Sequence, residues 1–147
     1  MDTFRRNRLL ISSLLILTVV WVCETASPSA AEPPLKPDFT IQTHETADVW
    51  FGDTVGTWRL SGVESDSGTV GGLHGCPTAK LWLEGGDLGV IYLETHCEVR
   101  TFEVLYGTGI YESWVGATGT YTIAYGRERN GYRAVRRKLE GFLPAAP

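Results

Sequence analysis

From Pro28 onward, glycine and proline interrupt this chain repeatedly, and their spacing limits what it can fold into. The 147 residues include 17 glycines and 7 prolines, with short runs of Val, Ile, Thr, Tyr and Trp between them. Short β-branched and aromatic runs bounded by turn residues are typical of strands, and we find no stretch with the apolar period of a helix. We therefore predict an all-β domain of about seven or eight short antiparallel strands.

The domain is predicted to span residues 48–143. Glu64–Gly75, which is polar and rich in Gly and Ser, is predicted to be a loop, and 32–47, with three prolines, a leader outside the domain. Because an open sheet would expose its edges, a small antiparallel β-barrel is favoured, with a β-sandwich as the alternative. The predicted strands are Val49–Phe51, Thr57–Val63, Ala79–Glu84, Asp87–Thr95, Arg100–Tyr106, Thr118–Tyr125 and Tyr132–Phe142.

Gly85 and Gly86 predict a two-residue hairpin turn, because glycine adopts the positive φ that such a turn needs. In the register that this turn sets, Cys76 lies nearly opposite Cys97. We predict a disulfide between them, which would stabilise the fold by about 3 kcal/mol. The same register places these apolar residues on one face: Leu81, Leu83, Leu88, Val90 and Tyr92.

A zinc site is the alternative use of these cysteines, since His74 and His96 stand close to them in the sequence. Two His and two Cys can bind zinc tetrahedrally. Adjacent strand residues such as His96 and Cys97, however, point to opposite faces of a sheet. The prediction is therefore a disulfide, with no metal and no cofactor.

The N-terminus has the pattern of an export signal. Three arginines lie within residues 5–8, Leu9–Cys23 is mostly apolar, and Ser29 and Ala31 supply the small side chains that a cleavage site needs. We predict a signal peptide at 1–31, cut after Ala31, and a secreted protein, periplasmic or extracellular. The apolar stretch is shorter than the about 20 residues of a spanning helix, so no stable membrane insertion is expected after cleavage. An uncleaved anchor and a lipoprotein modified at Cys23 are the alternatives.

The charge of the mature chain argues against nucleic acid as a partner. The full chain has 13 basic and 17 acidic residues; without three arginines, Asp2 and Glu24 of the signal, 10 basic and 15 acidic residues remain, a net charge of −5. Phosphate binding needs a clustered positive field. Six of the ten basic residues do lie within Arg127–Lys138. We interpret them as a solvated outer face or edge, the alternative being contact with an acidic surface.

Two segments resemble known barrels. Gly107–Glu112 (GTGIYE) and Gly116–Tyr121 (GATGTY) resemble the G-[ST]-G-x-[FY]…G-A-x-G motif of allene oxide cyclase and dirigent barrels, with the spacing lengthened by Ser113–Val115. That resemblance implies a barrel with an apolar cavity, in a superfamily that includes a fatty-acid epoxide cyclase and proteins that direct phenoxy-radical coupling. No catalytic position of either matches here. Gly56-Thr57-Trp58 is similar to the Gly-x-Trp start of lipocalins and avidin-like barrels, whose Trp closes the barrel bottom.

The candidate site residues follow from strand alternation for Glu94, His96 and Trp82 and from the Gly-rich connection for Trp114 and Tyr111. Glu94 and His96 share a strand face and could form an acid/base pair in a barrel mouth, whereas His44 and His74 are predicted to be solvated loop residues. Trp82, Trp114 and Tyr111 are the candidates for ligand contact.

We therefore expect a barrel that binds a small apolar or aromatic ligand without catalysis. A structural or cell-surface interaction protein and a cyclase or isomerase of the allene oxide cyclase-like superfamily are the alternatives. The sequence carries no signal for the oligomeric state.

Overall fold

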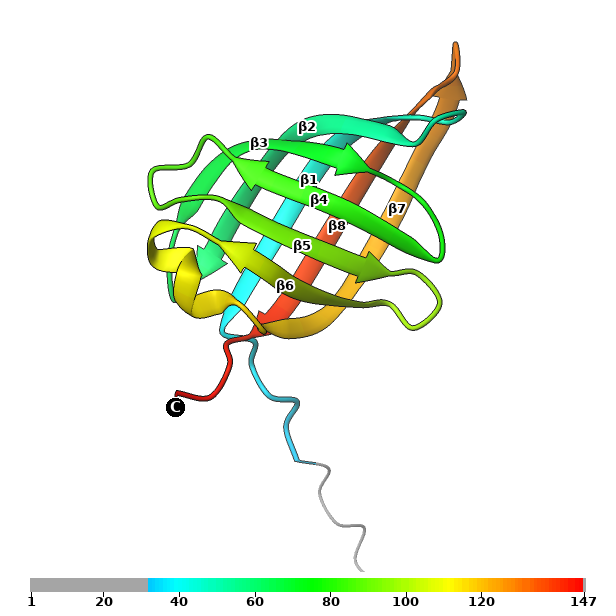
Figure 1. Ribbon diagram of the computed structural model, residues 1–147. Coiled ribbons are helices and arrows are strands. Elements are labelled where there is room, and N and C mark those ends of the chain that lie inside the picture. Colours follow the sequence, from blue (N-terminus) through cyan, green and yellow to red (C-terminus); the bar gives the residue numbers. More distant parts are fainter. Residues whose placement is uncertain (1–31, 147) are drawn as a thin grey trace, which may run out of the picture. The chain divides into compact units, whose positions relative to one another are not determined.

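The computed structural model describes residues 32–146; the predicted signal peptide and its cleavage site lie outside this range. Each strand pairs antiparallel with the next, and the last pairs with the first, which closes the sheet into a barrel (Figure 1). The predicted barrel is confirmed, and the sandwich is not formed. Its elements are β1 (Phe39–Asp48), β2 (Asp53–Gly62), β3 (Asp66–Leu73), β4 (Thr78–Glu84), β5 (Ile91–His96), β6 (Thr101–Gly107), the 3₁₀ helix η1 (Gly109–Trp114), β7 (Thr118–Arg129) and β8 (Tyr132–Phe142).

Strand β1 begins inside the segment that the sequence predicted to be a leader, so the barrel starts at Phe39 and not at residue 48. Its buried side chains alternate with exposed ones, as on any barrel strand. Two of these buried positions carry the polar residues Thr43 and Glu45, so the apolar alternation is interrupted in the sequence. The predicted strand Val49–Phe51 is instead the connection between β1 and β2.

The predicted loop Glu64–Gly75 contains strand β3, which is a second correction. The sequence pattern of this strand is hard to recognise, because its glycines leave few side chains that could show an inward–outward alternation. One of them is required by the packing of the sheet. A Cβ on Gly68 would lie only 2.0 Å from the backbone oxygen of Glu84.

The hairpin of β4 and β5 exists, but its turn is longer than predicted. Six residues, 85–90, connect the strands, and Leu83 pairs with Ile91. Ile91 and Leu93 therefore point inward, where the two-residue turn had predicted Val90 and Tyr92. The connection is held by Asp66, whose carboxylate accepts hydrogen bonds from the backbone amides of Asp87 and Leu88.

Helix η1 (yellow in Figure 1) closes one end of the barrel. Tyr111 and Trp114 are buried there, and the Trp114 ring lies 4.5 Å from that of Phe39. Gly109 and Gly116 have positive φ values of 61° and 89°, which explains the glycines at the two ends of this segment. This half of the interior is a core of buried apolar and aromatic side chains.

Asp66 joins β3 to this closed end. It accepts a 2.7 Å hydrogen bond from the Tyr111 hydroxyl as well as the backbone bonds to the β4–β5 connection. Partial burial of Asp66 would raise its pKa, but these hydrogen bonds together outweigh burial and lower the pKa below its ordinary 3.8. Burial, and then the bond to Asp66, raise the pKa of the Tyr111 hydroxyl, which therefore stays protonated and donates.

We expect Tyr111→Phe to lower the free energy of unfolding by about 1–3 kcal/mol, because a hydrogen bond to a charged group at the closed end is lost. Denaturant unfolding followed by fluorescence measures the change. Tyr106→Phe is the matched control, since Tyr106 is exposed on the outer wall and should change stability by less than about 0.5 kcal/mol. Equal stability of wild type and Tyr111→Phe would contradict the role given to this bond.

Candidate functional site: the open mouth of the barrel

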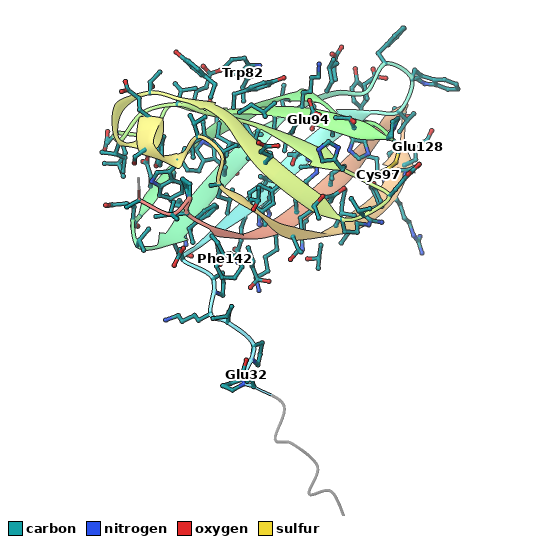
Figure 2. The ribbon with its side chains drawn as sticks, turned by 60° about the horizontal axis from the view of Figure 1, so that its bottom comes forward. Glu32, Trp82, Glu94, Cys97, Glu128 and Phe142 are labelled. Atoms are coloured by element: carbon teal, nitrogen blue, oxygen red, sulfur yellow. A yellow bond between two sulfur atoms is a disulfide. The ribbon has the colours of Figure 1, made fainter. Side chains whose placement is uncertain are left out.

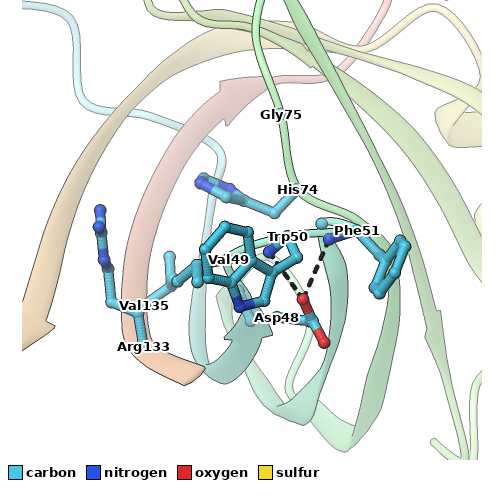
Figure 3. Close-up of a pocket in the computed structure, with 10 residues that line it drawn as sticks. Asp48, Val49, Trp50, Phe51, His74, Gly75, Arg133 and Val135 are labelled. Atoms are coloured by element: carbon cyan, nitrogen blue, oxygen red, sulfur yellow. Dashed lines mark hydrogen bonds between the residues drawn. The ribbon is translucent and has the colours of Figure 1, made fainter. Parts of the chain in front are cut away.

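The end of the barrel opposite η1 contains a cavity of about 330 Å³. It is surrounded by the β1–β2 turn, the β3–β4 connection and the start of β8 (Figure 3). Its volume lies at the lower end of the range of small-molecule pockets, which is about 300–1,000 Å³. The lining residues are Ala47, Asp48, Val49, Trp50, Phe51, Gly52, His74, Gly75, Arg133 and Val135.

The β1–β2 turn supplies the apolar rim of the cavity. Asp48 fixes the turn, because one of its carboxylate oxygens accepts hydrogen bonds from the backbone amides of Trp50 at 2.7 Å and Phe51 at 3.0 Å. The backbone of Val49 also donates to Gly131 of the β7–β8 hairpin. The side chains of Trp50 and Phe51 are nevertheless 78% and 80% exposed. The turn is thus an ordered backbone that presents two aromatic rings to solvent.

A buried polar layer lies below the cavity and separates it from the apolar core. Arg137 of β8 and Glu45 of β1 form an ion pair there, and they are only 2% and 4% exposed. Glu45 also accepts hydrogen bonds from the hydroxyls of Thr43 and Thr54. Both carboxylate oxygens are therefore occupied, which is the condition under which a buried charge is tolerated. Within residues 32–146, the Nε atom of Arg137 has no hydrogen-bond partner.

His74 connects this polar layer to the cavity. Its backbone amide donates to Gly52, and Arg137 Nη2 lies 2.5 Å from its Nδ1. Because arginine only donates, Nδ1 must be the acceptor, and the proton of the neutral ring is on Nε2. Burial lowers the pKa of His74, and the charge of Arg137 lowers it further against the opposing effect of Glu45. At neutral pH His74 is an uncharged donor in the cavity wall.

The predicted disulfide between Cys76 and Cys97 is present, with a Cα–Cα distance of 5.7 Å. It lies at the open end of the barrel, where Figure 2 places Cys97 on the same side as Glu128. The backbone of Cys97 also donates to Pro77. Since Cys76 follows His74 by two residues, the disulfide anchors the segment that carries the cavity histidine.

The structure places the predicted ligand residues outside this cavity. Tyr111 and Trp114 are part of the apolar core, because they seal the closed end of the barrel. Trp82 points away from the interior and is 43% exposed on the outer wall (Figure 2). Its ring stacks on that of Tyr92, with the ring centroids 4.2 Å apart, and lies edge-on to Tyr106, with the centroids 6.3 Å apart.

Glu94 and His96 do share a strand face, with His96 Nε2 3.8 Å from Glu94 Oε1. They lie on the outer face of β5, however, because Ile91, Leu93 and Thr95 occupy the inward positions. The prediction of an acid/base pair in the barrel mouth is therefore wrong.

Sequence reasoning missed the residues that do form the site. Glu45 fell in the predicted leader, and His74 was interpreted as a solvated loop residue. Arg137 and Arg133 were counted among the solvated cations of the C-terminal basic segment, of which Arg127, Arg129, Arg136 and Lys138 are indeed exposed. One signal was available in the sequence. Residues 133, 137 and 139 are separated by even numbers along one strand, so Arg133 and Arg137 lie on the same face as Leu139, a core residue.

No family model, curated protein or solved structure matches this chain. None of the helices in the described part of the chain is long and apolar enough to span a membrane. Nor do the described residues contain a cluster of three or more His, Cys, Asp and Glu side chains that could hold a metal ion.

The lowered pKa of His74 predicts a pH-dependent stability. Well above the ordinary histidine pKa of 6.5, the ring is neutral in the folded and unfolded states, and its environment contributes fully to stability. As pH falls below 6.5 the unfolded chain binds the proton first, so stability decreases until the folded-state pKa is passed. We expect His74→Asn, which keeps an acceptor for Arg137, to lack this decrease. Denaturant midpoints between pH 7.5 and 5 measure it.

His44→Asn is the control for that measurement, because His44 is exposed on the outer face of β1. It should retain the decrease seen in the wild type. Parallel stability profiles for the wild type and His74→Asn would show that His74 does not titrate as its contacts require.

Removing the disulfide is expected to lower the free energy of unfolding by about 3 kcal/mol, since it closes a loop with a sequence separation of 21. The Cys76→Ser/Cys97→Ser variant and reduced wild type should unfold at the same denaturant concentration, below that of oxidised wild type. An unchanged midpoint in both would contradict a structural role for the bond.

Proposed function

We propose that this chain is an exported β-barrel that binds a small molecule with an apolar or aromatic body in its mouth, without catalysis. One observation carries the proposal: the cavity of about 330 Å³ has aromatic side chains at its rim and a polar layer beneath it. Pockets that combine apolar walls with a few fixed polar groups are the usual form of small-molecule sites.

The filled interior limits where a ligand can bind. Below the polar layer, side chains such as Ile41, Leu139 and Trp58 are buried in the apolar core. The proposed ligand therefore stays at the mouth and is small. Trp50 and Phe51 would contact its apolar body, because they are the large apolar side chains of the cavity rim and gain most from leaving water.

Binding is favoured over acid/base catalysis by the state of the polar groups. A general base needs an oxygen or nitrogen that is free to take a proton. Glu45 has both oxygens occupied by Arg137 and two threonine hydroxyls, and Nδ1 of His74 already accepts from Arg137. What these groups leave available in the cavity is a donor, which suits recognition.

Export is supported by the N-terminal sequence and by the chemistry of the disulfide. Disulfides persist in oxidising compartments and are rare in the cytosol. A disulfide that anchors the His74 segment would hold the proposed site together only in such a compartment.

A surface of three aromatic rings favours an interaction protein as the second candidate. Trp82, Tyr92 and Tyr106 stand side by side on β4, β5 and β6, and Trp82 and Tyr106 are well exposed. Exposed aromatic clusters are typical of contact surfaces. This surface lies on the outer wall and is separate from the mouth.

Titration of the exported protein with N-phenyl-1-naphthylamine tests the two candidates. This uncharged probe becomes fluorescent in apolar sites. We expect binding in the micromolar range and a loss of at least about fivefold in affinity for Trp50→Ala, since a large apolar contact is removed. Trp82→Ala is the matched control and should bind as wild type does. A loss confined to Trp82→Ala, or no binding at all, would contradict the mouth as a ligand site.

A further inference from the structure

We propose that the mouth cavity selects ligands whose polar end is a carboxylate, recognised jointly by His74 and Arg133. This inference rests on the proposed function and names the class of ligand: a small organic acid with an apolar or aromatic body. It follows from the donors in the cavity wall, from their position, and from the bonds that Glu45 and Asp48 already make.

The first donor is the Nε2–H group of His74. Arg137 occupies Nδ1 of the ring, so the remaining ring nitrogen carries the proton. The Arg137 bond to Nδ1 holds the ring in this orientation, and the bond to Gly52 and the disulfide at Cys76 hold the main chain that carries it. The cavity wall therefore presents a fixed donor, and a ligand must supply an acceptor to use it.

The second donor is the guanidinium of Arg133. Its only ion-pair contact among residues 32–146 is with Glu128 at 4.0 Å, and both side chains are partly exposed. An exposed ion pair whose charged atoms are this far apart is weak. Arginine can offer two parallel N–H bonds to one carboxylate, which makes it well suited to this head group. A bound acid would compete with Glu128 for a donor that is poorly satisfied.

The two donors lie on the same wall of the cavity. The centroid of the Tyr125 ring lies 5.5 Å from the centroid of the His74 ring and 5.3 Å from Cζ of Arg133. In Figure 3, His74 and Arg133 lie to one side of the cavity and Phe51 to the other. A ligand can thus direct an anionic end toward the Tyr125 side and its body toward the aromatic rim.

The acidic groups near the cavity do not cancel this preference. Asp48 directs an oxygen at the amides of its own turn, and Glu45 is paired with Arg137 beneath the cavity. Arg137 and Glu45 neutralise each other, and Asp48 and Arg133 are the charged residues that line the cavity itself. The Asp48 carboxylate is bonded to the amides of the rim turn, so Arg133 supplies the positive charge on the His74 side of the cavity (Figure 3). A single negative head group matches that charge.

Calorimetric titration with a matched pair of probes tests the inference. The pair is 2-naphthaleneacetate and 2-naphthaleneethanol, which share a ring system and differ in the charge of the polar end. At pH 7.5 we expect the acid to bind the exported protein at least tenfold more tightly than the alcohol. Arg133→Gln should remove most of this preference and leave the affinity for the alcohol within about twofold.

Arg136→Gln is the matched control, since Arg136 is the exposed cation on the outward side of the same strand. It should keep the full preference for the acid. Arg133→Lys, which keeps the charge but not the planar fork, should give an intermediate preference.

The outcomes separate the two proposals. Equal affinity for acid and alcohol, with both weakened in Trp50→Ala, would overturn carboxylate selection and leave the mouth as a ligand site. A preference for the acid that Arg136→Gln removes and Arg133→Gln does not would place the anion on the outer face and also overturn it. Failure of both probes to bind in a Trp50-dependent manner would overturn the proposed function itself, and the inference with it.

Discussion

The buried ion pair between Glu45 and Arg137 is the interaction on which the open half of this barrel depends. Its two residues lie on β1 and β8, the strands that close the sheet, and they are 92 positions apart in the sequence. Removing one partner of such a pair leaves an uncompensated buried charge, which typically costs about 3–5 kcal/mol. Replacing both by apolar residues often costs little, so stability alone does not explain the pair. The pair instead positions a side chain, because it holds the Arg137 guanidinium where it can donate to His74.

This polar layer divides the interior into two parts with different roles. Toward η1 the barrel is filled by apolar and aromatic side chains, and Tyr111 and Trp114 close it. Toward the mouth, inward positions carry Thr43, Thr54 and the ion pair. A charged layer would exclude the apolar body of the proposed ligand from the deeper interior, since that body would have to cross paired charges that cannot be left unsatisfied. The ion pair that forms the floor of the cavity thus also bonds His74, the donor in its wall.

The sequence predicted the parts of the fold that depend on local pattern. Strand β8 was found with its observed bounds, and the disulfide followed from two cysteines at the ends of one hairpin. Strand β1 was missed because its inward positions are partly polar, and β3 because glycines replace the side chains that show alternation. In both, tertiary contact decides the structure: Glu45 is acceptable inside only because Arg137 is there, and Gly68 is required only because β4 approaches closely.

The candidate site was harder to predict for the same reason. Trp82 was predicted from its outward position in strand alternation and Trp114 from its place in a Gly-rich connection, but Trp114 and Tyr111 fill the core. The residues that line the mouth have ordinary local sequences, and closure of the barrel brings them together. His74 gains its role from three constraints of different origin: the amide bond to Gly52, the guanidinium of Arg137 and the covalent link at Cys76. Because the disulfide restrains this segment, the donor in the cavity wall is already in place, and binding of the proposed ligand would lose less entropy.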